Sequence, residues 1–389
     1  MKDAEAKKVL DAVRDLAPVI ASRAVDIESE RRLPVDLLDQ LKQAGLFRMF
    51  VPRSHGGHEV DLRAGMEILE TLARADAATG WTTMIGSETP HLFSLLSRER
   101  FDALYSGGPD VIVAGGFNAQ GQAAVEEGGY RVTGRWGFAS GCQHADWLFG
   151  NCVVHAEGQP LPGLAEGTSR TRAMLLRPDA VHILDTWNAL GLKGTGSHDI
   201  EVREAFCPEE SSFDIFFGTP HVRGAGLVAP LLHFALHMAA VSLGIAQGAL
   251  DDVVKLVGTG KRRMYARVPL SESPVFQLHL GRADTSVRAA RALLRDLSDE
   301  FWAACEGDFA AIPALAPRVS AALAWVAETA AEVVGTCYQA GGASSLQDGS
   351  SLQRRFRDIH TFRQHAAAAE GWFGQAGAAL VGQPTGLWT

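Results

Sequence analysis

The chain has 389 residues, of which 47% are hydrophobic and 21% are charged, values typical of a globular protein with a full core. Its formal net charge of −9 argues against a surface that binds nucleic acid or an acidic membrane, because both need a cationic footprint. The 5 cysteines are scattered and include no CxxC pair, which argues against a disulfide framework or a zinc site and favours reduced thiols in the cytoplasm.

Residues 1–108 have the pattern of a helical domain. Apolar side chains recur at spacings of three and four over residues 9–20, which predicts an amphipathic helix. A second helix is predicted over residues 35–43, with a proline just before it and a glycine shortly after it. A third helical run spans residues 62–75.

Residues 109–222 change to short apolar segments bounded by Gly, Pro or Asp, a pattern typical of strands. Residues 123–125 and 130–132 flank a Glu-Glu-Gly-Gly turn and predict a β-hairpin. Further strands are predicted at 111–113, 147–154, 173–176, 181–184 and 200–206. We expect an antiparallel sandwich or barrel of roughly 110 residues.

Residues 223–389 are rich in alanine and have the apolar period of long helices. Helices are predicted at 231–256, 278–303, 314–339 and 362–380, which together indicate a bundle. Residues 224–250 carry no Asp, Glu, Lys or Arg and are long enough to cross a bilayer. Their proline, histidines and glycines favour a helix buried inside the bundle, so we expect no membrane segment.

The order of helices, β-domain and helical bundle resembles that of the acyl-CoA dehydrogenase superfamily. Gly-Leu-Phe at 45–47 with Gly-Gly at 56–57 resembles the N-terminal signature of that superfamily. WNALGLKGTGS at 187–197 resembles its strand connector, and Arg-Asp at 357–358 resembles its C-terminal signature. The resemblance implies an α+β fold with an N-terminal helical domain, a central antiparallel β-domain and a C-terminal four-helix bundle, assembled as a homotetramer.

One segment points to a branch of that superfamily. GRWGFASGCQHADW at 134–147 resembles a segment of the two-component (group D) flavin-dependent monooxygenases, whose members hydroxylate phenols such as 4-hydroxyphenylacetate. The resemblance implies that a separate NAD(P)H-dependent reductase supplies reduced FMN or FAD. That flavin would react with O₂ to give a C4a-hydroperoxyflavin, which oxygenates an aromatic or polycyclic, phenol-like substrate. The chain has no GxGxxG βαβ unit for a nicotinamide, which fits a separate reductase.

The resemblance also assigns a catalytic histidine. The glutamate base of many acyl-CoA dehydrogenases aligns with Ala366, and the next carboxylate is Glu370. His365 matches a histidine that the monooxygenases place at the flavin, and imidazole is a suitable acid–base group near neutral pH. Without the surrounding motifs, His365 would be interpreted as a core histidine.

Four further positions follow from the same resemblance, each with a structural alternative. Ser140 matches a serine that hydrogen-bonds the flavin near N5, although a serine before glycine also suits a turn. Trp136 and Phe138 would wall the flavin ring, although aromatic residues in strands are core residues by default. His91 matches a histidine that orients the phenol oxygen, and its alternative is a capping or surface histidine.

The phenol also sets an energetic requirement. A phenol of pKa about 10 and a histidine of pKa about 6.5 differ by roughly 3.5 units, about 5 kcal/mol, so the pocket must stabilise the phenolate. We assign that role to His91 and the backbone near it.

Two more groups of residues remain open. In the superfamily, an arginine and a glutamine at the second bundle helix touch the flavin of the neighbouring subunit, and Arg263, Arg267 and Gln277 are the candidates, unless they are solvated loop residues. His233 and His237 lie one helical turn apart, as metal ligands can, but no third ligand is evident and we expect no metal.

Three other functions remain as alternatives. An N-oxygenase of amines or amino sugars would use the same oxygen chemistry without deprotonating a phenol. An acyl-CoA dehydrogenase would need a carboxylate base beside the flavin. A flavin-binding protein without activity would have no use for Ser140 and His365.

Overall fold

The N-terminal region is helical, as predicted. The computed structural model describes residues 4–264 and 266–386. The N-terminal helices are α1 (Ala4–Ser22), α2 (Ala24–Glu30), α3 (Val35–Gln43), α4 (Leu62–Ala75), α5 (Ala77–Ser87), α6 (Thr89–Phe93) and α7 (Arg98–Tyr105). The bounds of α3 and α4 confirm the prediction, because apolar periodicity and capping residues mark both ends of each helix. Asp61 caps α4 by accepting from the backbone N–H of Ala64.

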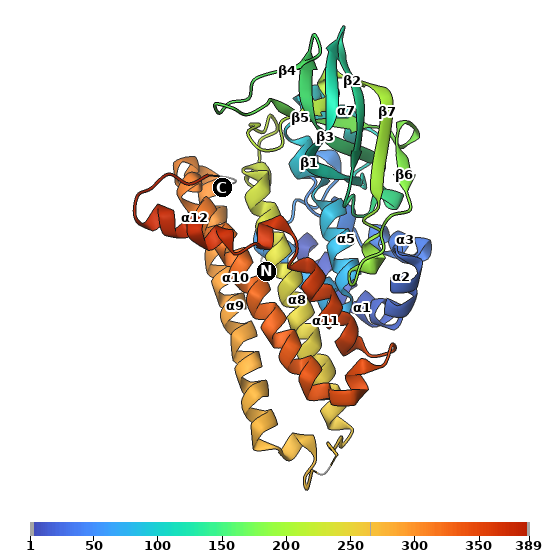
Figure 1. The fold of residues 1–389 in the computed structure, drawn as a ribbon, viewed down its shortest axis with the longest axis vertical. Helices are drawn as coiled ribbons and strands as arrows, with labels where there is room; N and C mark the ends of the chain where they lie inside the picture. Colours follow the sequence, from blue (N-terminus) through green and yellow to red (C-terminus); the bar gives the residue numbers. More distant parts are fainter. Residues whose placement is uncertain (1–3, 265, 387–389) are drawn as a thin grey trace.

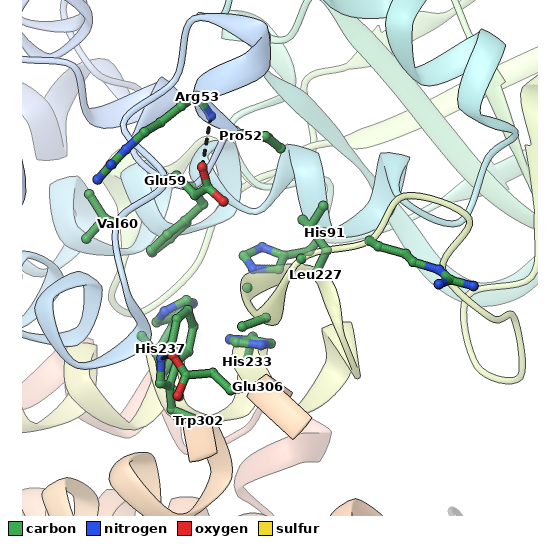
Figure 2. Close-up of a pocket in the computed structure, with 16 residues that line it drawn as sticks. Pro52, Arg53, Glu59, Val60, His91, Leu227, His233, His237, Trp302 and Glu306 are labelled. Carbon is green, nitrogen blue, oxygen red and sulfur yellow. Dashed lines mark hydrogen bonds between the residues drawn. The ribbon is translucent and has the colours of Figure 1, made fainter. Parts of the chain in front are cut away.

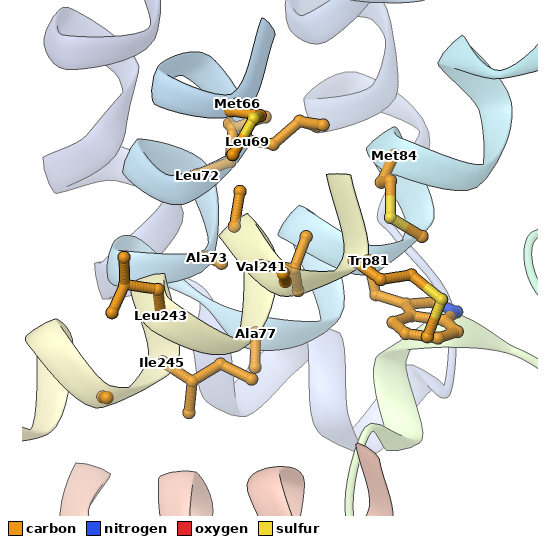
Figure 3. Close-up of a cluster of buried hydrophobic side chains, with 14 of the residues drawn as sticks. Met66, Leu69, Leu72, Ala73, Ala77, Trp81, Met84, Val241, Leu243 and Ile245 are labelled. Atoms are coloured by element: carbon orange, nitrogen blue, oxygen red, sulfur yellow. The ribbon is translucent and has the colours of Figure 1, made fainter. Parts of the chain in front are cut away.

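The N-terminal helices and the C-terminal bundle share one hydrophobic core. Figure 3 shows Leu69 of α4, Trp81 of α5 and Val241 of α8 (Pro230–Gly258) within this cluster. Gly244 of α8 lies so close to α4 that an added Cβ would be 2.3 Å from the carbonyl oxygen of Glu70. The two helical regions are therefore packed as one body, with α5 buried between them and the β-domain.

The central region is a single sheet. Its strands are β1 (Val113–Glu126), β2 (Gly129–Trp136), β3 (Trp147–Ala156), β4 (Gln159–Pro160), β5 (Thr171–Leu176), β6 (His182–Leu184), β7 (Asp199–Pro208) and β8 (Ser212–Phe213). Their order is β6-β7-β2-β1-β3-β5-β8, with β4 on β3. The β1–β2 hairpin is confirmed, with Glu126 opposite Gly129.

The expectation of a purely antiparallel sheet is wrong for one pair, because β1 and β3 are parallel. After the hairpin, β2 occupies one side of β1, and residues 137–146 cross back so that β3 runs along the other side in the same direction as β1. The sheet is strongly curved, since the thiol of Cys207 on β7 lies 3.6 Å from the carbonyl oxygen of Leu175 on β5.

The C-terminal region is a bundle of α8, α9 (Pro274–Gly307), α10 (Ile312–Gly341) and α11 (Ser351–Phe362), followed by α12 (Gly371–Leu380) (Figure 1). The predicted helix at 362–380 is wrong, because α11 ends at Phe362 and α12 begins only at Gly371. Between them the side chain of His365 accepts a hydrogen bond from the backbone N–H of Ala367 and caps a 3₁₀ turn, Ala366–Ala368. This local cap interrupts a sequence whose alanine content would continue a helix.

Among the residues that the structure describes, two helical segments are long and apolar enough to cross a membrane. In Pro230–Gly258, 78% of the most apolar window is buried within the fold, so α8 is an interior helix of the bundle, as expected. In Phe309–Leu346, only 44% of that window is buried, so α10 leaves part of its apolar surface uncovered in the single chain.

Candidate active site

Ser140 and His365 lie at one site, where the indole of Trp81 connects them. The indole N–H of Trp81 donates to Oγ of Ser140 over 3.0 Å. The centroid of the His365 ring lies 5.6 Å from that of Trp81, in an edge-on contact. Two residues that are distant in the sequence are therefore neighbours, one from the loop after β2 and the other from the turn after α11. Sequence analysis did not identify Trp81, since α5 is buried around nearly its whole circumference and no periodicity marks one side chain.

A chain of hydroxyl groups fixes the hydrogen of Ser140. Oγ1 of Thr195 donates its single hydrogen to the carbonyl oxygen of Leu192 over 2.7 Å, so it accepts from Ser197 at 2.6 Å. Ser197 must then accept from Ser140, at 2.7 Å. Ser140 thus donates to Ser197 and accepts from Trp81, which leaves one lone pair of its oxygen free to accept from a ligand. Thr195 and Ser197 belong to the connector at 187–197, but sequence analysis gave neither a role.

His365 is a neutral hydrogen-bond donor at this site. Its Nδ1 accepts from the backbone N–H of Ala367 over 3.2 Å, so the ring hydrogen is on Nε2. Burial lowers the pKa of His365 to about 4, which keeps the imidazole neutral at physiological pH. Its ring lies 5.6 Å from Trp81 and 6.4 Å from Phe234 of α8, between centroids. The site therefore offers one donor at His365 and one acceptor at Ser140.

The two aromatic candidates of the signature segment differ in placement. Trp136 is fully buried, donates to the carbonyl oxygen of Asn151 over 2.7 Å and belongs to the core of the sheet, which fits its structural alternative. Phe138 is 71% exposed and has a φ of 63°, a left-handed conformation that is uncommon for a bulky residue. It lies 6.2 Å from the ring of Trp187, edge-on. An exposed aromatic ring two residues before Ser140 offers a surface that a flat ligand can cover.

These groups fit a reduced flavin. An exposed aromatic surface at Phe138 suits a flat tricyclic ring, and the free lone pair of Ser140 suits a ring N–H such as N5–H. Nε2–H of His365 can donate to an oxygen bound beside the ring.

His91 lies on the other side of α8, in a cavity of about 350 Å³. Only 2% of His91 is exposed, so the alternative of a surface histidine is wrong. Figure 2 shows His91 of α6 facing His233 and His237 of α8. The rings of His91 and His233 are stacked with centroids 5.1 Å apart, and Phe50 stacks on His237 at 4.5 Å.

A buried carboxylate contacts two of these histidines. Glu88, at the end of α5, is 3% exposed, and its Oε1 lies 2.5 Å from Nδ1 of His237. Its Oε2 lies 2.6 Å from Nδ1 of His91, an ion-pair contact whose angle is outside the range of a hydrogen bond. Burial alone would raise the pKa of Glu88, but His91 and His237 outweigh it and hold that pKa well below its usual range.

Glu88 was not identified from the sequence, because a carboxylate at the end of a helix is usually a surface residue. Its burial beside two histidines from other helices is a property of the tertiary structure alone. The described residues contain no group of three or more His, Cys, Asp and Glu side chains placed to hold a metal. His233 and His237 contribute instead to the wall of the cavity.

The two histidine sites are neighbours across helices α5 and α8. Phe234 contacts His365, whereas the adjacent residue His233 contacts His91. Trp81 and Glu88 are two turns apart on α5, about 10 Å along its axis. The Ser140 site and the His91 cavity are therefore about two helical turns apart along α5, and the adjacent residues Phe234 and His233 of α8 each contact one of them.

Arg263, Arg267 and Gln277 lie at the far end of the bundle, in and after the loop that joins α8 to α9 (Figure 1). The length of α8 between Phe234 and that loop is about 35 Å at the helical rise per residue. Gln277 donates to the carbonyl oxygen of Ser271, and both arginines are exposed. Within one chain these residues do not reach Ser140 or His365, so a role in flavin binding requires a second copy.

Comparison with known proteins identifies relatives of the chain. The family model of the acyl-CoA dehydrogenase N-terminal domain matches residues 3–94, and that of the C-terminal domain matches residues 236–370. An indole-3-acetate monooxygenase of Pseudomonas putida is 29% identical over 96% of this chain and 92% of that protein. A flavin-dependent monooxygenase, oxygenase subunit HsaA, of Rhodococcus jostii is 29% identical over 90% of this chain and 92% of its own length. The crystal structure of a 3-HSA hydroxylase from Rhodococcus sp. RHA1 has a TM-score of 0.87 at 25% identity and covers 97% of this chain and 98% of that one.

These relatives confirm two expectations. The acyl-CoA dehydrogenase fold extends over nearly the whole chain, and the two relatives named above are monooxygenases. The resemblance found in the segment 134–147 is thereby confirmed as well.

Proposed function

We propose, from the premise that this chain belongs to the acyl-CoA dehydrogenase superfamily, that it is the oxygenase component of a two-component flavin-dependent monooxygenase and hydroxylates an aromatic, phenol-like substrate. One observation carries the proposal. Ser140 and His365 meet across Trp81, and alanine stands where many dehydrogenases of this superfamily place their base. A hydroxyl and a neutral imidazole can form hydrogen bonds with a reduced oxygen species, whereas abstraction of a proton from carbon needs a stronger base.

Reduced flavin, when bound, supplies the two electrons that activate O₂. The residues of this chain bind the flavin and keep water away from it. Ser140 would accept from a ring N–H of the flavin, and Trp81 and Ser197 hold its hydroxyl in place. With flavin bound, His365 would offer its Nε2–H to an oxygen atom beside the ring, and Phe234 and Phe362 would add apolar surface around the imidazole and the indole that excludes water.

The substrate occupies the His91 cavity. A volume of about 350 Å³ lies at the lower end of small-molecule sites and suits one or two aromatic rings. Phe50 and Trp302 supply aromatic walls, and His91 supplies a polar contact for a hydroxyl group. His233 lines the cavity and is adjacent in α8 to Phe234, which contacts His365, so a ring bound in the cavity would lie near the flavin site.

A thioester dehydrogenase is the weaker alternative. Glu370, the next carboxylate after position 366, is exposed and lies beyond the turn that carries His365. Glu88 is buried, but its two oxygens face His91 and His237 rather than the Ser140 site. Neither carboxylate is placed as a base beside the proposed flavin.

The partners follow from the same proposal. A separate NAD(P)H-dependent reductase would supply the flavin, and both reduced FMN and reduced FAD are compatible with the Ser140 site. A homotetramer would bring Arg263, Arg267 and Gln277 to a neighbouring flavin and could cover the exposed apolar surface of α10. All five cysteines are buried free thiols, which supports a cytoplasmic location.

The test separates oxygenation from dehydrogenation. The protein is mixed anaerobically with reduced FMN or reduced FAD and a panel of phenols and indoles, and ¹⁸O₂ is then admitted. We expect one labelled oxygen atom in the product. Absence of labelled product, together with reduction of bound oxidised flavin by butyryl-CoA, would replace the proposal by the dehydrogenase alternative.

A further inference from the structure

The two histidines of the proposed reaction have opposite hydrogen-bonding roles. Nδ1 of His365 accepts from the backbone, so its Nε2 carries hydrogen and can only donate. Nδ1 of His91 faces a carboxylate, which when ionised can only accept, so a neutral His91 ring would carry its hydrogen on Nδ1. Its Nε2 then has a lone pair and can take a proton from a ligand in the cavity that the ring lines.

Glu88 is the group that imposes this arrangement. Its two oxygens are divided between Nδ1 of His91 and Nδ1 of His237, two histidines from different helices. All three side chains are at most 4% exposed, so water does not compete for these contacts. A carboxylate behind an imidazole both fixes its tautomer and stabilises the positive charge that forms when it accepts a proton.

We propose that Glu88 is a positioning residue that fixes His91 as the base for a substrate hydroxyl, so that the cavity selects phenols which must ionise before oxygenation. This inference rests on the proposed function. The O–H bond of the phenol breaks as an N–H bond forms at Nε2 of His91, and the Glu88 carboxylate balances the resulting imidazolium. The phenolate oxygen keeps the electron pair, and no electron is exchanged in this step.

Other charged groups bear on the same proton. His237 shares the carboxylate, and His233 stacks on His91 but stays neutral, because burial and the two other histidines lower its pKa well below the usual value. Four charged side chains also line the cavity: Arg53, Glu59, Arg223 and Glu306. In contrast to these four, Glu88 lies within 2.6 Å of the His91 ring.

The substitution Glu88→Gln tests the inference. A glutamine side chain has one acceptor oxygen, a donor NH₂ group and no charge, so it cannot place a carboxylate oxygen against each of the two Nδ1 atoms. With 4-hydroxyphenylacetate as the probe, we expect turnover to fall on the order of 10- to 100-fold, as for loss of part of a general base. With its more acidic 3-fluoro analogue, which needs less help to ionise, we expect a distinctly smaller loss. An equal loss of turnover with both probes would mean that Glu88 has only a structural role. Unchanged turnover with both would mean that it has no role. Either result overturns the inference.

A second measurement needs no turnover. Nitrogen NMR of ¹⁵N-histidine-labelled protein without substrate distinguishes a ring nitrogen that carries hydrogen from one that does not, and His91→Asn assigns the His91 signals. We expect hydrogen on Nδ1 of His91 in the parent protein and a changed pattern at His91 or His237 in Glu88→Gln. Glu306→Gln, a cavity carboxylate that accepts from Trp302, is the matched control and should leave both rings unchanged.

A negative result has a different meaning in each of the two measurements. If the parent protein oxygenates neither probe, the proposed function is in question, and the NMR result alone decides the role of Glu88. A His91 ring with hydrogen on Nε2 and none on Nδ1 would overturn the inference even if the protein proves to be a monooxygenase.

Discussion

The site at Ser140 and the cavity at His91 lie on two sides of α8 and handle charge in different ways. The Ser140 site consists of neutral groups, a hydroxyl chain and an imidazole whose pKa is lowered to about 4, all held by loops and turns. The His91 cavity has an ionised carboxylate beneath two histidines, all held by helices. A neutral site suits a ligand that must be kept from water, and a charged site suits a ligand that must lose a proton.

The largest effect is expected from His365→Ala. It removes the Nε2–H donor, and we expect the yield of oxygenated product to fall by about 10²- to 10⁴-fold, as for loss of a general acid–base group. Binding of reduced flavin should change much less, because the hydroxyl chain at Ser140 is intact. The measurement is product formation with reduced flavin supplied in excess. His360→Ala, which changes a histidine of α11 in tilted ring contact with Phe356, is the control and should retain activity.

The hydrogen bond that joins α11 to the connector at 187–197 leads to a prediction about the pH dependence of stability. Oδ1 of Asp358 on α11 accepts from the backbone N–H of Leu192 over 2.6 Å, and burial raises the pKa of Asp358 to about 7 from an ordinary value of 3.8. A raised pKa means that the folded protein holds a proton which the unfolded chain releases. The resulting stability is complete below about pH 4 and is lost as the pH rises through about 7.

Asp358→Asn keeps the acceptor oxygen and removes the charge. We therefore expect the free energy of unfolding of the parent protein to fall relative to that of the variant between pH 4 and 7, by as much as about 4 kcal/mol. Urea unfolding at several pH values measures the difference. A difference that does not change with pH would show that Asp358 is charged in the folded protein at all these pH values.

Ser140→Ala should weaken the flavin site without affecting the cavity. The variant loses the acceptor for the flavin N–H, and a net hydrogen bond contributes about 0.5–1.5 kcal/mol, so we expect reduced flavin to bind roughly 2- to 10-fold more weakly. An anaerobic equilibrium titration measures this. Ser242→Ala, which removes a buried hydroxyl bonded only within α8, is the control. Equal effects of the two changes would remove Ser140 from the flavin site.

Trp81→Phe should have the smallest effect. The phenyl ring preserves the aromatic contact with His365 but cannot donate to Ser140. Since Ser140 keeps its bond to Ser197, we expect less than about a threefold loss in reduced-flavin affinity. The same titration tests it, and a loss larger than that of Ser140→Ala would mean that Trp81 itself contacts the ligand.

The sequence predicted the elements that have local signals. Helices α3 and α4 are marked by apolar periodicity and by capping or breaking residues, and the β1–β2 hairpin by its glycine turn. The parallel pairing of β1 with β3 was not predictable in this way, because the alternation of side chains is the same in parallel and antiparallel strands. The break between α11 and α12 was missed because it contains a 3₁₀ turn capped by a histidine side chain within an alanine-rich segment.

The site was predictable only in part. Ser140 and His365 were found through motifs, and the structure brings them together. Trp81 and Glu88 were missed because what distinguishes them is the residues that surround them, which come from distant parts of the chain. Phe138 and Trp136 looked equivalent in the sequence, but the left-handed turn at position 138 exposes one ring while the curved sheet buries the other.

The most direct test of the central claim is a single turnover that follows the fate of oxygen. Parent protein and His365→Ala are each loaded anaerobically with reduced flavin and a phenol that the parent oxygenates, and limiting ¹⁸O₂ is added. We predict that the parent converts most of the oxygen into labelled product, whereas the variant consumes the same oxygen but releases it as hydrogen peroxide. Equal ratios of product to peroxide in the two proteins would contradict the role of the Ser140–Trp81–His365 site.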